Sequence, residues 1–174
     1  MKTFYLTIMI VVFLLLCTTG IQAQTTQTQL NQVELMKQFV GTWKCELGKD
    51  TNYFKFSEII SETKSFGEGG FEGYQKILRK DKILSEEKFV SGYDKKSDKY
   101  INALIRKNNP EISLGLSWFT SSNTCERIPF EYISNPEQAT PIFIYEFKST
   151  DSMIGTVIDN NKTVGTFKWF RIKN

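Results

Sequence analysis

Histidine is absent from this chain of 174 residues. Without it the chain cannot form a Ser-His-Asp or Cys-His catalytic pair, a histidine-ligated haem, or a zinc site of mixed cysteine and histidine ligands. The turn that holds Asp94 and Asp98 supplies too few oxygens to suggest calcium. We therefore expect neither a metal nor a cofactor.

The chain also lacks a strong excess of charge of either sign. It has 22 Lys and Arg residues against 19 Asp and Glu residues, a formal charge of +3. The lysines are interspersed with acidic residues rather than gathered into a stripe, so nucleic acid is not an expected partner. With 40% hydrophobic and 14% aromatic residues, the chain is not of the disordered class, and its length fits one domain.

A long apolar run occurs near the N-terminus, from Tyr5 to Cys17, between the charged Lys2 and the small Ala23. This pattern predicts a signal peptide over residues 1–23, and hence a secreted or periplasmic protein. The run is shorter than the roughly 20 residues that span a bilayer, so no membrane span is expected. A lipid anchor at Cys17 is an alternative, although the preceding residue is leucine rather than a small residue.

Two cysteines, Cys45 and Cys125, remain after cleavage in a chain bound for an oxidising compartment. A disulfide between them is one alternative, and closing so long a loop would add on the order of 4 kcal/mol. The alternation of side chains along the strands favours two separate thiols. Cys45 shares a predicted inner face with Trp43, whereas Cys125 shares its face with Arg127 and Glu131, which indicates an outer face.

The mature chain begins with a polar segment without periodicity, residues 24–29, which we expect to be a flexible leader. Apolar residues then recur at helical spacing from Leu30 to Phe39. Asn31 and Glu34 match the spacing of a capping box, and Gly41 follows as a stop. One short N-terminal helix is therefore predicted at the start of a domain that covers residues 30–174.

Everything after Gly41 is typical of strands separated by turn-forming residues. Short strands joined by tight turns favour an antiparallel meander closed into a barrel, because closure removes exposed edges. The predicted class is all-β with about ten strands: Thr42–Leu47, Tyr53–Ser61, Phe71–Arg79, Lys82–Ser91, Tyr100–Arg106, Ile112–Thr120, Cys125–Ile133, Ile142–Lys148, Ser152–Ile158 and Thr163–Ile172.

Three residues at the first and last strands of the predicted barrel carry a family resemblance. Gly41 and Trp43 lie where the helix meets the first strand, and Arg171 lies in the last strand. This arrangement resembles the lipocalin and fatty-acid-binding superfamily, the calycins. The resemblance implies that Arg171 packs across Trp43 and closes the base of the barrel, a cation–π contact worth roughly 0.5–2 kcal/mol.

The middle of the chain resembles secreted or cytosolic bacterial lipocalin-like domains with a leading helix, through Gly92-Tyr93-Asp94 and the following Tyr100. The chain differs from lipocalins proper in having no helix after the barrel. It differs from fatty-acid-binding proteins in having no helix pair between the first two strands. A related branch holds haem through histidine, and the lack of histidine excludes that activity.

Aromatic residues dominate several strand faces. Alternating apolar residues first of all build a core, but a barrel of eight to ten strands often encloses a small apolar ligand. On that interpretation, tyrosine hydroxyls on an apolar wall would orient the ligand. The candidate ligand-binding residues are Tyr93, Tyr100, Trp118, Phe143 and Tyr145.

Binding of a small, largely apolar molecule is thus the expected function, by analogy of fold. Two alternatives remain open from the residues. The barrel could house an enzyme, an isomerase or hydrolase that uses Tyr, Glu or Arg groups, which a buried carboxylate of raised pKa would favour. It could instead be a protein-binding or envelope-structural module with a solid interior, which an exposed apolar patch would favour.

Overall fold

The computed structural model describes residues 29–47 and 56–173. The expected signal peptide, residues 1–23, and nearly all of the expected leader, residues 24–29, lie outside the described residues, so both stay predictions. Within the part of the chain that is described, no helix has the length and apolar character needed to cross a bilayer.

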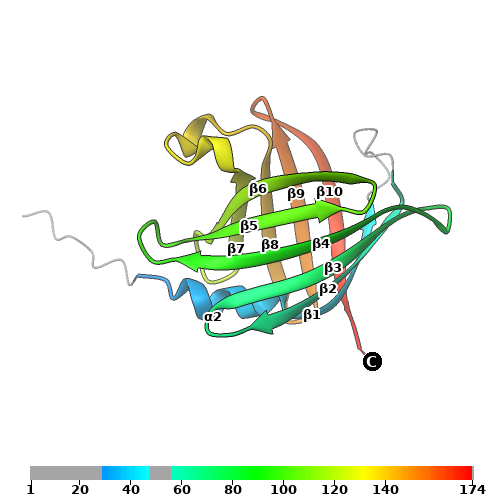
Figure 1. Ribbon diagram of the computed structural model, residues 1–174, viewed down its shortest axis with the longest axis horizontal. Coiled ribbons are helices and arrows are strands. Elements are labelled where there is room, and N and C mark those ends of the chain that lie inside the picture. Colours follow the sequence, from blue (N-terminus) through cyan, green and yellow to red (C-terminus); the bar gives the residue numbers. More distant parts are fainter. Residues whose placement is uncertain (1–28, 48–55, 174) are drawn as a thin grey trace, which may run out of the picture.

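Ten antiparallel strands form a closed barrel within the described residues, each paired with its neighbours along the chain, and β1 pairs with β10 to complete the ring (Figure 1). The expected all-β meander barrel is confirmed. The strands are β1 (Gly41–Leu47), β2 (Glu58–Phe66), β3 (Gly70–Arg79), β4 (Lys82–Asp94), β5 (Lys99–Arg106), β6 (Asn109–Phe119), β7 (Thr124–Pro129), β8 (Ile142–Ser149), β9 (Ser152–Asp159) and β10 (Lys162–Ile172).

Tight hairpins with a left-handed backbone connect several of these strands. Lys80 and Asp81 have φ angles of 48° and 64° between β3 and β4, and Asn160 and Asn161 have 48° and 60° between β9 and β10. Positive φ at two successive turn residues matches the right-handed twist of the flanking strands. The meander therefore follows from local turn chemistry as much as from the strands.

Several strands differ in their bounds from the sequence prediction, β2 and β7 by the most residues. The strand expected over Tyr53–Ser61 continues to Phe66 as β2, and the start of that expected range lies outside the described residues. The strand expected over Cys125–Ile133 ends at Pro129, where a 3-10 turn, η3 (Phe130–Tyr132), begins. Proline has no N–H to donate to a neighbouring strand, which accounts for the early end.

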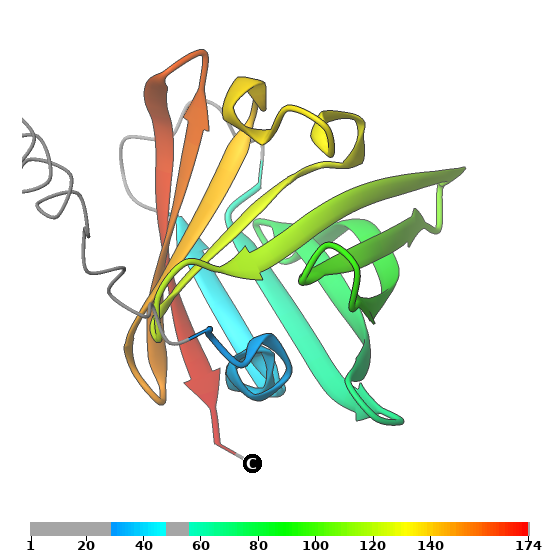
Figure 2. The same ribbon diagram turned by 90° about the vertical axis from the view of Figure 1, so that its left-hand side faces the viewer.

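A short helix, α2 (Gln32–Met36), and a 3-10 turn, η2 (Lys37–Phe39), lie across one end of the barrel (Figure 2). As expected, Asn31 caps the helix by accepting a hydrogen bond from the Glu34 N–H at 3.1 Å. The side chain of Gln32 is buried. Its amide donates to the carbonyl of Phe119 at 3.0 Å and accepts from the Phe119 N–H at 2.7 Å, which ties the helix to β6.

Arg171 joins this helical end to the last strand. Its guanidinium carbon lies 4.3 Å from the centroid of the Trp43 ring, and its nitrogens donate to the carbonyls of Gln38, at 3.0 Å, and Val40. Gly41 has a φ of 121°, and a Cβ atom there would lie 2.5 Å from Nη1 of Arg171. Gly41, Trp43 and Arg171 thus meet at the base of the barrel.

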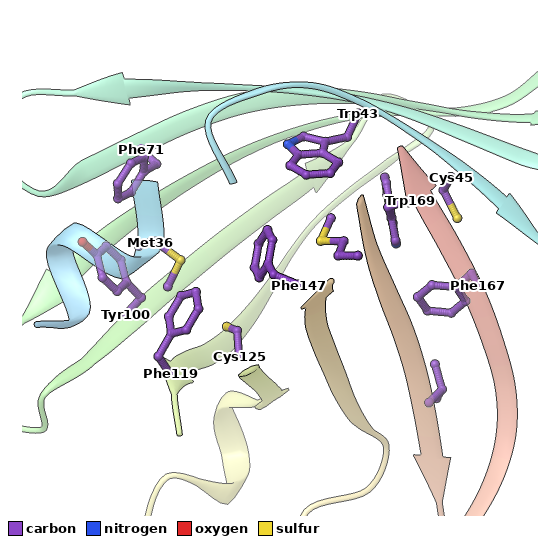
Figure 3. Packing of buried hydrophobic residues seen from close by; sticks show 12 residues of the cluster. Met36, Trp43, Cys45, Phe71, Tyr100, Phe119, Cys125, Phe147, Phe167 and Trp169 are labelled. Carbon is purple, nitrogen blue, oxygen red and sulfur yellow. The ribbon is translucent and has the colours of Figure 1, made fainter. Parts of the chain in front are cut away.

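The buried core extends from the helix along the barrel interior (Figure 3). Cys45 and Cys125 both belong to it and both are free thiols. The phase argument that set Cys125 on an outer face was wrong, because Arg127 shares its inward face. Burial raises the pKa of Cys45 to about 12 and raises that of Cys125 as well, so both thiols stay protonated at neutral pH.

We expect Arg171→Met to lower the free energy of unfolding by about 2–4 kcal/mol, because it removes the cation–π contact and three charge-assisted hydrogen bonds, to the carbonyls of Gln38, Val40 and Thr150. Urea denaturation monitored by circular dichroism measures the change. The neighbouring Lys173, whose side chain is 78% exposed, provides the control. Lys173→Met should shift stability by less than about 0.5 kcal/mol, and equal effects of the two substitutions would contradict this account.

We also expect Cys45 and Cys125 to be inert toward Ellman's reagent at pH 8 in the native protein, because the thiolate is the reactive form and burial suppresses it. Unfolding in guanidinium chloride should expose two further reactive thiols per chain. If unfolding without a reductant releases none, the two cysteines are bridged and the structure described here does not hold for them.

Candidate functional site

The barrel interior contains a chamber of about 130 Å³ next to the helix. Met36 and Phe39 from the helical segment, together with Trp43 and Phe71, supply apolar side chains around it. An engineered apolar cavity of roughly 150 Å³ holds a benzene molecule, so this inner chamber has room for about one ring or a few methylene groups.

A larger chamber of about 650 Å³ lies toward the opposite end of the barrel. Ile59, Ile77, Phe143 and Phe167 contribute apolar side chains to its wall. Its volume falls in the range of roughly 300–1,000 Å³ that is usual for ligand pockets. The two chambers adjoin, because they share five lining residues: Gln75, Leu104, Arg127, Tyr145 and Trp169.

One wall of the inner chamber is polar and well satisfied. Ser91 donates to the amide oxygen of Asn102 at 2.7 Å, and the amide nitrogen of Asn102 donates to Ser117 at 3.0 Å. Asn102 and Ser117 are both buried. These three side chains come from β4, β5 and β6, which place them side by side through their register, Ser91 opposite Asn102 and Tyr100 opposite Ser117.

An ion pair lies deeper in the wall of the outer chamber. Glu87 is 3% exposed and accepts from Nε of Arg106 at 2.9 Å, and it also accepts from the Gln75 amide. Arg106 donates in turn to Ser113 at 3.2 Å. On β4, Glu87 shares the inward face with Phe89, which lines the inner chamber.

Arg127 and Tyr145 line both chambers. Arg127 makes no hydrogen bond and no ion pair with any residue in the described part of the chain, although its charge acts on Cys125 and Tyr145 nearby. Burial raises the pKa of Tyr145, partly offset by the Arg127 guanidinium, so the phenol keeps its proton at neutral pH. Where the two chambers meet, the wall therefore carries an arginine that has no ion-pair partner among the described residues.

Of the five residues expected to bind a ligand, the structure brings Phe143 and Tyr145 to the cavity. Tyr93 and Tyr100 line neither chamber; their ring centroids lie 5.5 Å apart, and Tyr100 packs on Phe71 near the helical end. Tyr93 donates to Asp98 at 2.5 Å. The helix and Phe71 fill the space that would otherwise open these two tyrosines to a ligand.

Trp118 is also outside the cavity. Ser113, Gly115 and Ser117, on the small side of β6, line the chambers, and Trp118 lies on the opposite, apolar side. On that apolar side, the exposed Ile112 and Leu114 also border the outer chamber. There the Lys99 ammonium lies 4.1 Å from the centroid of the Trp118 ring. The connection between β7 and β8 covers the neighbouring part of this outer face and forms a second apolar cluster with it.

Sequence reasoning missed Arg127, Gln75 and Trp169 as cavity residues. The alternation along β7 was taken to place Arg127 on an outer face, and nothing in the sequence singled out Gln75 or Trp169. The sequence did contain one signal: Cys125 and Arg127 are two residues apart, as are Phe167 and Trp169, so each pair lies on one face of its strand. Deciding that these faces point inward requires the closed barrel.

Neither a scan of the sequence against models of protein families nor a search of curated proteins found a match. The case for a function therefore rests on the geometry of the barrel interior. That geometry is a cavity of two adjoining chambers with walls of mixed apolar and polar side chains, a satisfied polar network, and Arg127 without an ion-pair partner among the described residues.

Proposed function

We propose that this protein is a lipocalin-like binding protein, secreted or periplasmic, that holds a small, largely apolar molecule inside its barrel. The observation that carries the proposal is the pair of adjoining chambers of about 130 and 650 Å³. A core packed for stability alone leaves few voids larger than a water molecule. An interior of this size is more suited to a guest than to the protein's own side chains.

The residue types around the chambers support an apolar guest. Isoleucine, phenylalanine, tryptophan and methionine side chains contribute much of the wall, and burial of apolar ligand surface stabilises a complex by roughly 25 cal/mol per Å² before the costs of association. Several of the polar groups are held in fixed places, by the hydrogen bonds of Asn102 and by the Glu87–Arg106 pair. This is the usual composition of a site that binds by burial and orients by a few hydrogen bonds.

The enzyme alternative gains no support from the interior carboxylate. Glu87 is held by Arg106 and Gln75, so it is not free to act as a general base. Ser117 receives a hydrogen bond from Asn102, and no histidine exists to activate it.

A protein-binding role has one observation in its favour. Val90, Ile105, Ile112 and Leu114 are exposed on the outer face of β4, β5 and β6, and Ile105 lies opposite Ile112 in the register. Exposed apolar strips of this kind often mark contact surfaces. The hollow interior, however, has no part in such a role, so ligand binding accounts for more of the structure.

The neutral fluorophore N-phenylnaphthylamine tests the cavity directly. We expect it to bind the wild-type protein with increased fluorescence, and we expect Ser61→Phe to weaken binding by about tenfold or more, because a phenyl ring at this position fills much of the inner chamber. Ser65→Phe is the matched control on the same strand, where the side chain is exposed. Absence of binding to the wild type, or equal loss in both variants, would refute the cavity site.

A further inference from the structure

Four large apolar side chains are exposed together on the outer face of β4, β5 and β6. Val90 is 55% exposed, Ile105 43%, Ile112 65% and Leu114 45%. The register places them in two neighbouring rows, one of Val90, Ala103 and Leu114 and one that pairs Ile105 with Ile112. These five residues form one continuous surface, the outer strip. Soluble monomers rarely expose a large contiguous apolar surface unless it binds a partner.

The protein itself covers the same face of the sheet immediately beside the outer strip. Leu116, which follows Leu114 on this side of β6, is fully buried, and Ile128 of β7 is 2% exposed. Phe130 and Tyr132 of η3 pack against this pair. The cover that the connection between β7 and β8 provides stops short of Leu114. The outer strip is therefore the uncovered continuation of a buried apolar cluster.

Unpaired charges of opposite sign flank the outer strip. Lys88 lies opposite Ile105 and is exposed on the β4 side. Glu131 is exposed on η3, beyond the β6 side. Neither side chain forms an ion pair with any residue that the structure describes. The neighbouring outward residue of β4, Glu86, is paired with Lys107, so it does not neutralise Lys88.

These features are self-complementary under two-fold symmetry. Most homodimers are isologous, which means that the same surface of each copy meets itself. A two-fold axis parallel to the strands sets β5 of one copy against β5 of the other, so the β4 side of each copy faces the β6 side of the other. Lys88 then faces Glu131 of the second copy, and this contact occurs twice. An apolar centre with a polar rim is the usual anatomy of an interface.

We propose that the outer strip is the interface of a two-fold homodimer, in which the apolar side chains pack together and Lys88 pairs with Glu131 of the second copy. A second copy accounts for both flanking charges, whereas an anionic lipid surface would favour cations all around the strip and would repel Glu131. Ile112 and Leu114 also border the outer chamber, so the interface adjoins that chamber. The inference goes beyond ligand binding and does not depend on it.

Sedimentation equilibrium of the full chain tests the interface. We expect the mass of a dimer at tens of micromolar protein. Val90→Lys places an unpaired charge in the apolar centre of both copies and should weaken dimerisation by about a hundredfold or more. Phe170→Lys is the matched control, because Phe170 is 42% exposed on β10, away from the strip, and should leave the dimer intact. Both positions are exposed, so circular dichroism should show that both variants fold.

Charge reversal tests the two-fold arrangement itself. Lys88→Glu sets two acidic groups against each other and Glu131→Lys sets two basic groups against each other, so each alone should weaken the dimer by about tenfold. The chain that carries both substitutions regains opposite charges across the interface and should return to within about threefold of the wild-type dissociation constant. A role of either residue in the stability of one copy would not produce this recovery.

A monomeric wild type at these concentrations would overturn the proposal, and so would a dimer that survives Val90→Lys or is weakened equally by Phe170→Lys. Failure of the combined charge reversal to recover would overturn the two-fold arrangement that the proposal specifies. If Val90→Lys does not fold, the charge-reversal series decides the same question. None of these measurements uses a ligand, so their outcome is separate from the test of the binding function.

Discussion

Closure of the sheet between β1 and β10 decides which face of each strand points inward. Six residue pairs join these two strands, and Arg171 extends the junction to the carbonyls of the helical segment. Once the ring is closed, each strand contributes one face to the interior whatever its hydrophobicity. That constraint explains why the small and polar side of β6 lines the cavity while its apolar side faces outward.

The interior polar groups fall into two sets with different consequences. Glu87 with Arg106, and Ser91 with Asn102 and Ser117, satisfy one another and stiffen the wall. Arg127, Trp169 and Tyr145 do not find acceptors among the described residues. The first set needs no further partner, because its members satisfy one another. The second set remains available to groups that enter the cavity.

Much of the fold could be predicted from residues that act locally. The Asn31 cap, the hairpin at Asn160 and the alternation along each strand need no tertiary information. Strand direction in the barrel could not be predicted in the same way, because alternation shows that two faces differ but not which one is inside. Trp118 is the clearest case: its apolar face is covered from outside by the segment between β7 and β8, far along the chain.

The same limitation applied to the site. Arg127 suggested an outer face because charged side chains are rarely buried, yet it lines both chambers. Gln32 was unexpected for a related reason, since its buried amide serves the backbone of Phe119 rather than the helix itself. A polar side chain that forms hydrogen bonds with a residue across the barrel leaves no recognisable pattern in the sequence around it.

The most direct measurement is the response of the three tryptophan indole N–H resonances to N-phenylnaphthylamine in a nitrogen-15 NMR titration of the labelled protein. Trp169 faces the cavity with a free donor, Trp43 donates to Phe39, and Trp118 lies on the outer face. We predict the largest shift for Trp169 and none for Trp118. A shift confined to Trp118 would place the ligand outside the barrel and contradict the account.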